Sequence, residues 1–105
     1  MIFITGPLYS GKRTFAAALP GSRLADVQDL APAAEDLAAL ADRLCREYDI
    51  LIATEVGGGV VPVDEDQRAA REAAGRLACL LAARADTVVR LFCGLPTVLK
   101  GRIEP

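Results

Sequence analysis

The sequence contains no histidine and no tryptophan. The lack of histidine excludes a Ser-His-Asp or Cys-His nucleophile, a histidine-ligated metal ion and phosphohistidine chemistry. Cysteines are few and odd in number, with no CxxC pair, so we interpret them as free thiols in a reducing cytosol and not as a disulfide or a zinc site. They are Cys45, Cys79 and Cys93.

Strong charge and long hydrophobic runs are also missing. The net charge is −2 and the pI is about 5.0, which argues against nucleic-acid binding. No apolar run approaches the ~18 residues of a membrane span. Residues 1–5 lack the cationic segment of a signal peptide. We therefore expect a cytoplasmic protein that does not contact membranes.

The pattern along the chain alternates between strand-like and helix-like segments. With 105 residues, of which 52% are hydrophobic, we expect one domain over residues 1–105. Such alternation predicts an α/β fold in which a mainly parallel sheet of about four to five strands lies between helices. The predicted strands are 1–5, 22–27 (weak), 50–54 and 87–93, and the predicted helices are 13–19, about 32–48 and about 64–85.

Three boundaries carry specific expectations. Pro32 is expected in the first turn of the second helix, with Glu35 and Asp36 near its positive end. Residues 57–59 fall in the loop before the third helix. The Gly-Leu-Pro sequence at 94–96 is expected to end the last strand.

The loop at residues 6–12 fits the G-x-x-x-x-G-K core of a P-loop and lies between a predicted strand and a predicted helix. Its glycines allow backbone N–H groups to point toward a phosphate, and the helix adds its positive end. The alternative is a glycine-rich turn without a ligand. We predict that the fold is a three-layer, P-loop NTPase-like sandwich. ATP or GTP is predicted to bind to Gly6, Pro7, Leu8, Tyr9, Ser10, Gly11, Lys12, Arg13 and Thr14.

One position departs from the P-loop pattern. The residue after Lys12 is normally a serine or threonine whose hydroxyl binds Mg²⁺, but here it is Arg13, and Thr14 follows one position late. One step along a helix turns a side chain by ~100°, so Thr14 does not replace the missing hydroxyl. We predict that nucleotide binding depends only weakly on Mg²⁺ and that phosphoryl transfer is slow or absent.

Glu55 is a second candidate catalytic residue beside Lys12. It follows the strand at 50–54 directly, and ligands of open α/β sheets bind at that edge. Its carboxylate could orient a metal-bound water or accept a proton from a substrate hydroxyl. The alternative is a solvated acid at the start of a loop.

The segment after Glu55 offers candidate contacts to a phosphate or substrate. Gly57, Gly58 and Gly59 allow a ligand to approach the backbone closely, although a connector without a ligand explains them equally. Arg68 and Arg71 lie near the start of the next helix and could hold a phosphate in bidentate fashion. Their alternative is an exposed ion-pair network around Glu72.

Residues 54–62, Thr-Glu-Val-Gly-Gly-Gly-Val-Val-Pro, resemble the T-x-E-V-G-x-G-I-V-P signature of the bifunctional adenosylcobinamide kinase/adenosylcobinamide-phosphate guanylyltransferase family of cobalamin biosynthesis. Residues 68–76, 85–86 and 94–100 are similar to further family elements, and residues 6–12 are similar to its P-loop. The resemblance covers about residues 1–19 and 48–101. It implies phosphoryl transfer from ATP or GTP to a corrinoid hydroxyl, and a homo-oligomer, since family members form trimers.

The departures from the family suggest other functions. Its members are considerably longer between the P-loop helix and the strand at 50–54, where this chain has about 30 residues. That block carries the family's guanylylated histidine and an additional acidic strand end, so the resemblance implies that the guanylyl-transfer route is closed here. Together with Arg13, this favours a degenerate nucleotide- or corrinoid-binding module with a regulatory or assembly role. A generic P-loop phosphotransferase is a third hypothesis.

Overall fold

A five-stranded sheet runs through the middle of the structure, in the order β2-β3-β1-β4-β5. The computed structural model describes residues 1–7, 10–19, 21, 23–27, 30–31, 34–55 and 65–102. Its elements are β1 (Ile2–Gly6), α1 (Lys12–Ala17), β2 (Leu24–Asp26), α2 (Leu37–Glu47), β3 (Ile50–Thr54), α3 (Glu65–Arg84), β4 (Thr87–Phe92) and β5 (Leu95–Lys100).

The first four strands are parallel, as the alternation of strands and helices predicted. β1 lies between β3 and β4, with Thr5 aligned to Ala53 on one side and to Arg90 on the other. β2 pairs with β3 at one edge of the sheet. This α/β architecture, a mainly parallel sheet with helices on both faces, agrees with a P-loop NTPase-like fold.

β4 ends at Phe92, close to the end expected for this strand, but residues 95–100 form a further strand, β5, which the sequence did not predict. Cys93 and Gly94 have φ angles of 52° and 77° and form a two-residue turn, and β5 returns antiparallel to β4. Two positive φ angles are what a mirror-image hairpin turn requires. Pro96 lies within β5, which is an edge strand, the position in a sheet where proline is tolerated.

The second helix begins later than Pro32. Asp36 is the N-cap residue of α2, and its carboxylate accepts a hydrogen bond from the Ala39 N–H at 3.1 Å. A side-chain cap satisfies an N–H group that has no partner within the helix, so Asp36 precedes the helix and does not lie inside its first turn. Pro32 itself lies outside the described residues.

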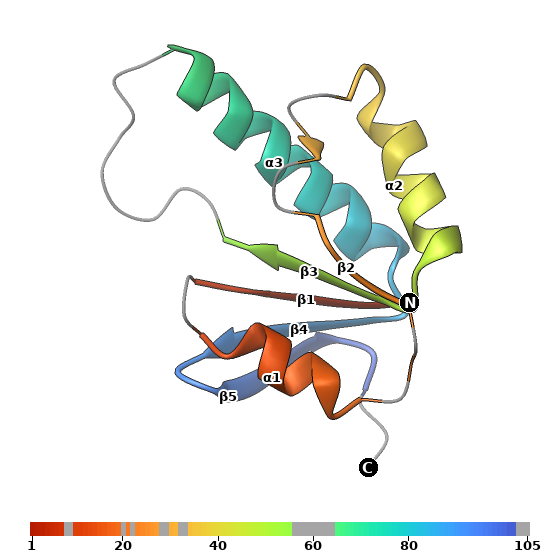
Figure 1. The fold of residues 1–105 in the computed structure, drawn as a ribbon, viewed down its shortest axis with the longest axis vertical. Coiled ribbons are helices and arrows are strands. Elements are labelled where there is room, and N and C mark those ends of the chain that lie inside the picture. The colour runs from red at the N-terminus through yellow and green to blue at the C-terminus, as the bar shows by residue number, and fades with distance from the viewer. Residues whose placement is uncertain are drawn as a thin grey trace.

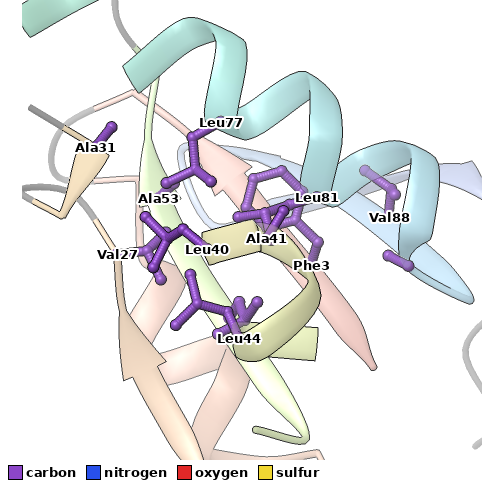
Figure 2. Packing of buried hydrophobic residues seen from close by; sticks show 12 residues of the cluster. Phe3, Val27, Ala31, Leu40, Ala41, Leu44, Ala53, Leu77, Leu81 and Val88 are labelled. Carbon is purple, nitrogen blue, oxygen red and sulfur yellow. The ribbon is translucent and has the colours of Figure 1, made fainter. Parts of the chain in front are cut away.

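The helices lie on both faces of the sheet, α2 and α3 on one and α1 on the other (Figure 1). Side chains alternate along each strand, so Phe3 and Leu51 face the helix pair while Ile4 and Ile52 face α1. Figure 2 shows the core beneath the helix pair, where Leu44 and Leu77 meet residues of the sheet. Among the described residues, none of the helices combines the length and hydrophobicity that a membrane span needs.

Candidate active site

The predicted phosphate loop connects β1 to α1. Gly6 ends β1 with φ 155°, and a Cβ atom placed there would lie 2.4 Å from the Leu91 carbonyl oxygen. Gly11 is the N-cap of α1 and has φ 87°, which a residue with a side chain rarely adopts. Both glycines are therefore required by the path of the backbone. Leu8 and Tyr9 lie outside the described residues.

Lys12 is the first residue of α1 and is only 8% exposed. Its ammonium group donates hydrogen bonds to the Pro7 carbonyl at 2.7 Å and to the Ser10 hydroxyl at 3.4 Å. Burial lowers the pKa of Lys12, while the negative charges of Asp26 and Glu55 act in the opposite direction. Both of these acceptors are neutral, so the buried cation is well placed to receive an anionic ligand.

A pocket of about 340 Å³ opens beside Lys12. It lies on the α1 side of the sheet, at the ends of β2 and β3, where open α/β sheets bind ligands. The described part of the loop thus borders open space, while the Lys12 side chain reaches back to the Pro7 carbonyl within the loop. The lining residues are Ser10, Gly11, Lys12, Arg13, Thr14, Asp26, Ile52 and Thr54.

Arg13 faces the same pocket and is paired with Asp26. An Arg13 Nη donates to the Asp26 carboxylate at 3.2 Å, and the arginine side chain is 68% exposed. Asp26 is the last residue of β2, so the chain does have a second acidic strand end near the loop, which the sequence analysis assigned to the missing block of the family. The signal available in the sequence was a carboxylate at the end of the weak strand predicted at 22–27.

Glu55 extends the ladder of β3 by one residue, because its N–H donates to the Gly6 carbonyl at 2.8 Å. Its side chain is not simply solvated. Arg90 of β4 binds both carboxylate oxygens, through Nε to Oε1 and through Nη2 to Oε2, the latter at 3.0 Å. Sequence analysis missed Arg90, although a single charged residue inside the apolar strand at 87–93 is an unusual feature.

Of the remaining predicted contacts, the structure describes only the two arginines of α3. Arg68 and Arg71 lie in the first two turns of α3, and neither is among the described residues that line the space beside Lys12. Within α3, Arg76 bonds Glu72 at 2.5 Å, at the i,i+4 spacing that is typical of ion pairs on a helix. Gly57, Gly58 and Gly59 lie outside the described residues.

A comparison with protein families matches residues 23–99 to the family described as cobinamide kinase / cobinamide phosphate guanyltransferase. The match covers well over half of the chain. The chain belongs to this family. A comparison with curated proteins found no match of significance. Family membership supports a kinase- or transferase-type role in cobalamin biosynthesis.

The family match and the site overlap only in part. The matched segment includes Asp26, Glu55 and Arg90, and it also includes residues 23–47, which the sequence resemblance left out. It begins after residues 6–12, so it carries no information on the phosphate loop. The assignment of the loop therefore depends on its own geometry, namely the two glycines with positive φ angles and the buried lysine beside the pocket.

The residues of this cobinamide kinase / cobinamide phosphate guanyltransferase homologue do not fit Mg²⁺ at the usual P-loop position. That position needs a hydroxyl oxygen after the lysine, and the Arg13 guanidinium has donors but no acceptor. Arg13 also occupies one side of the Asp26 carboxylate. The described part of the chain contains no group of three or more His, Cys, Asp or Glu side chains arranged to hold a metal ion.

Proposed function

We propose that this protein binds ATP or GTP at residues 6–14 and transfers the terminal phosphoryl group to a hydroxyl of a corrinoid, an adenosylcobinamide. The observation that carries the proposal is the buried Lys12 ammonium beside an open pocket, with a carboxylate, Glu55, at the end of the strand next to the loop. Family membership supports the choice of acceptor.

In the proposed reaction, Lys12 and the loop bind the phosphates and offset their negative charge. Glu55 accepts the proton of the acceptor hydroxyl. The hydroxyl oxygen forms a bond to the terminal phosphorus as the bond from that phosphorus to the bridging oxygen breaks. The bonding electrons leave with the nucleoside diphosphate. A histidine-dependent guanylyl transfer is not proposed, because the sequence has no histidine.

In this proposal, the Arg13 guanidinium supplies positive charge beside the phosphates, where an ordinary P-loop holds Mg²⁺. Its exposed pair with Asp26 is worth at most about 1 kcal/mol, so a phosphate can replace the carboxylate as its partner. We expect similar ATP affinity with Mg²⁺ and with EDTA when calorimetry is used. Asp26→Asn is expected to strengthen ATP binding in EDTA, because it removes a competing anion. A collapse of affinity in EDTA would contradict this mode of binding.

Turnover is tested with adenosylcobinamide and either ATP or GTP, by detecting the phosphorylated corrinoid. Wild type is expected to form product slowly, because Arg13 replaces the hydroxyl that binds Mg²⁺, and Glu55→Gln is expected to lose most of this activity while keeping nucleotide affinity. Lys12→Met is expected to lose nucleotide binding itself. Equal nucleotide affinity of Lys12→Met and wild type would remove the phosphate-loop assignment.

The second candidate is a module that binds nucleotide or corrinoid without turnover, in a regulatory or assembly role. One observation favours it: Arg13 and not a hydroxyl stands beside the pocket, and it is paired with Asp26. The two candidates differ in one result. Nucleotide binding that depends on Lys12, without corrinoid-dependent product, selects the binding module.

We also propose that the chain forms a homo-oligomer. Every residue of the edge strand β5 is exposed, and Leu95 and Leu99 are 70% and 58% exposed. Exposed apolar side chains on an edge strand support association with another chain. Light scattering at micromolar concentration should give a mass above that of the monomer, and a monomeric mass would contradict the proposal.

A further inference from the structure

Glu55 and Arg90 meet across the end of an intervening strand. Glu55 follows β3, Arg90 lies in β4, and β1 runs between these two strands. Thr5 of β1 is aligned with Arg90, so the arginine side chain has to cross the end of β1 to reach the carboxylate. The contact therefore ties together the carboxyl ends of the three central strands.

The guanidinium is held from two directions. It makes two hydrogen bonds to the two oxygens of Glu55, and it lies over the ring of Phe92 with 5.9 Å between its central carbon and the ring centroid. The hydrogen bonds and charge of Glu55 raise the pKa of Arg90. A two-point contact fixes the rotation of a carboxylate, which a single hydrogen bond does not.

The paired carboxylate keeps the capacity to react. A carboxylate has about four acceptor positions on its two oxygens, and the arginine uses two of them. The Glu55 side chain is 34% exposed and lines a second hollow of about 150 Å³ beneath α3. Thr54, the residue before Glu55, lines both this hollow and the pocket beside Lys12, whereas Glu55 itself lines only the hollow.

We infer that Arg90 is a positioning residue, which holds the Glu55 carboxylate in the orientation needed to accept the proton of the acceptor hydroxyl. This inference rests on the proposed phosphoryl transfer. It assigns Arg90 no contact with nucleotide, because Arg90 is not among the residues that line the pocket beside Lys12. Its removal should therefore affect the chemical step and leave nucleotide binding intact.

The experiment compares wild type, Arg90→Met, Arg90→Lys, Glu55→Gln and the double variant Arg90→Met/Glu55→Gln. Phosphorylation of adenosylcobinamide gives kcat and both KM values, and calorimetry gives ATP affinity. Arg76→Met is the matched control, because it removes an arginine from an ion pair with Glu72 on the exposed side of α3. Thermal unfolding of each variant reports whether the fold is retained.

We expect Arg90→Met to lower kcat by about 10- to 100-fold and to change ATP affinity less than twofold. Arg90→Lys keeps the charge but offers no planar fork, so it should recover part of the lost kcat. In the Glu55→Gln background, Arg90→Met should have no further effect. Arg76→Met should retain wild-type kcat.

Several results would overturn the inference. One is a kcat for Arg90→Met within twofold of wild type, and another is a loss that persists unchanged in the Glu55→Gln background. If Arg90→Met fails to fold, Arg90→Lys decides, and a wild-type kcat for that variant contradicts the inference. If wild type binds ATP without forming product, the proposed function is refuted, and this role of Arg90 with it. If wild type is active and Arg90→Met is equally active, only the inference on Arg90 is refuted.

Discussion

The two faces of the sheet are built differently. Among the described residues, twelve buried ones form the core beneath α2 and α3, whereas five form the core beneath α1. The site residues Lys12 and Arg13 belong to α1, a helix of six residues on the thinner side. In this part of the chain, most of the buried core thus lies on one face of the sheet, while the pocket beside Lys12 opens on the other.

This difference suggests that stability and ligand binding can be changed separately. A helix of six residues has little stability of its own and depends on the packing of residues such as Ala16 against the sheet. The helix pair on the other face contains 11 and 20 residues and packs around Phe3 and Leu51. Substitutions on the two faces should therefore affect different measurements.

Gly6 is the expected exception to this separation, and its substitution should have the largest effect. A Cβ atom at Gly6 would lie 2.4 Å from the Leu91 carbonyl oxygen, so β1 and β4 would have to separate at the start of the loop. We expect Gly6→Ala to cost on the order of 4 kcal/mol in the free energy of unfolding.

Gly94→Ala is the matched control for Gly6→Ala. Gly94 has a φ of 77°, but apart from its chain neighbours no atom of the described residues lies within 4 Å of the position that its Cβ would take. In Gly94→Ala only the strain of a left-handed conformation remains, so we expect the free energy of unfolding to fall by about 1 kcal/mol. Urea unfolding measures both values, and equal losses would show that the close approach at Gly6 is not what makes glycine necessary there.

The comparison of the two faces is sharpened by truncating one side chain on each. Leu81 of α3 is completely buried, and Leu81→Ala should cost about 3 kcal/mol through lost burial and an unfilled cavity. Phe15 of α1 is half-buried, so Phe15→Ala should lower the free energy of unfolding by about 1 kcal/mol. ATP affinity should change more in Phe15→Ala than in Leu81→Ala, because Phe15 lies in the helix that begins at Lys12. The reverse order of either effect would contradict the division between the faces.

The sequence predicted the elements of this site better than the contacts between them. The strand before Glu55, the short helix after the loop and the Glu72–Arg76 pair of α3 follow from local patterns, and the described residues contain each of them. The strand β5 was missed because its turn is Cys-Gly and not Asn-Gly, and because Pro96 suggested an end. Local sequence signals do not reveal a pair of strands whose turn lacks the usual residues.

The two arginine–carboxylate pairs were missed for another reason. Glu55 and Arg90 are 35 residues apart and meet only because β1 lies between β3 and β4. Arg13 and Asp26 meet only because β2 lies beside β3, next to the loop. The order of strands in a sheet is set by packing of the whole chain, and no local pattern in this sequence specifies it.

The smallest expected effect concerns the amino ends of the parallel strands, which lie opposite the carboxyl ends where the candidate site is. Opposite the site, the amino group of Met1 donates to the Asp86 carboxylate at 2.7 Å, between the starts of β1 and β4. This hydrogen bond, together with the positive charge of the amino group, holds the pKa of Asp86 below its ordinary value. The folded state therefore binds the Asp86 proton less readily than the unfolded state. The stabilisation is present above the unfolded pKa and is lost as the pH falls through the folded pKa.

Asp86→Asn should accordingly flatten the acid limb of a stability-against-pH curve, measured by urea unfolding at a series of pH values. Acetylation of the Met1 amino group removes the same interaction, so it should flatten the curve in the same way and add nothing in the Asp86→Asn variant. ATP affinity should be unchanged in both, because the Met1–Asp86 pair lies at the amino ends of the strands, away from Lys12. An acid limb unchanged by Asp86→Asn would contradict the role of the Met1–Asp86 pair. Weaker ATP binding in that variant would show that the amino and carboxyl ends of the strands do not act independently.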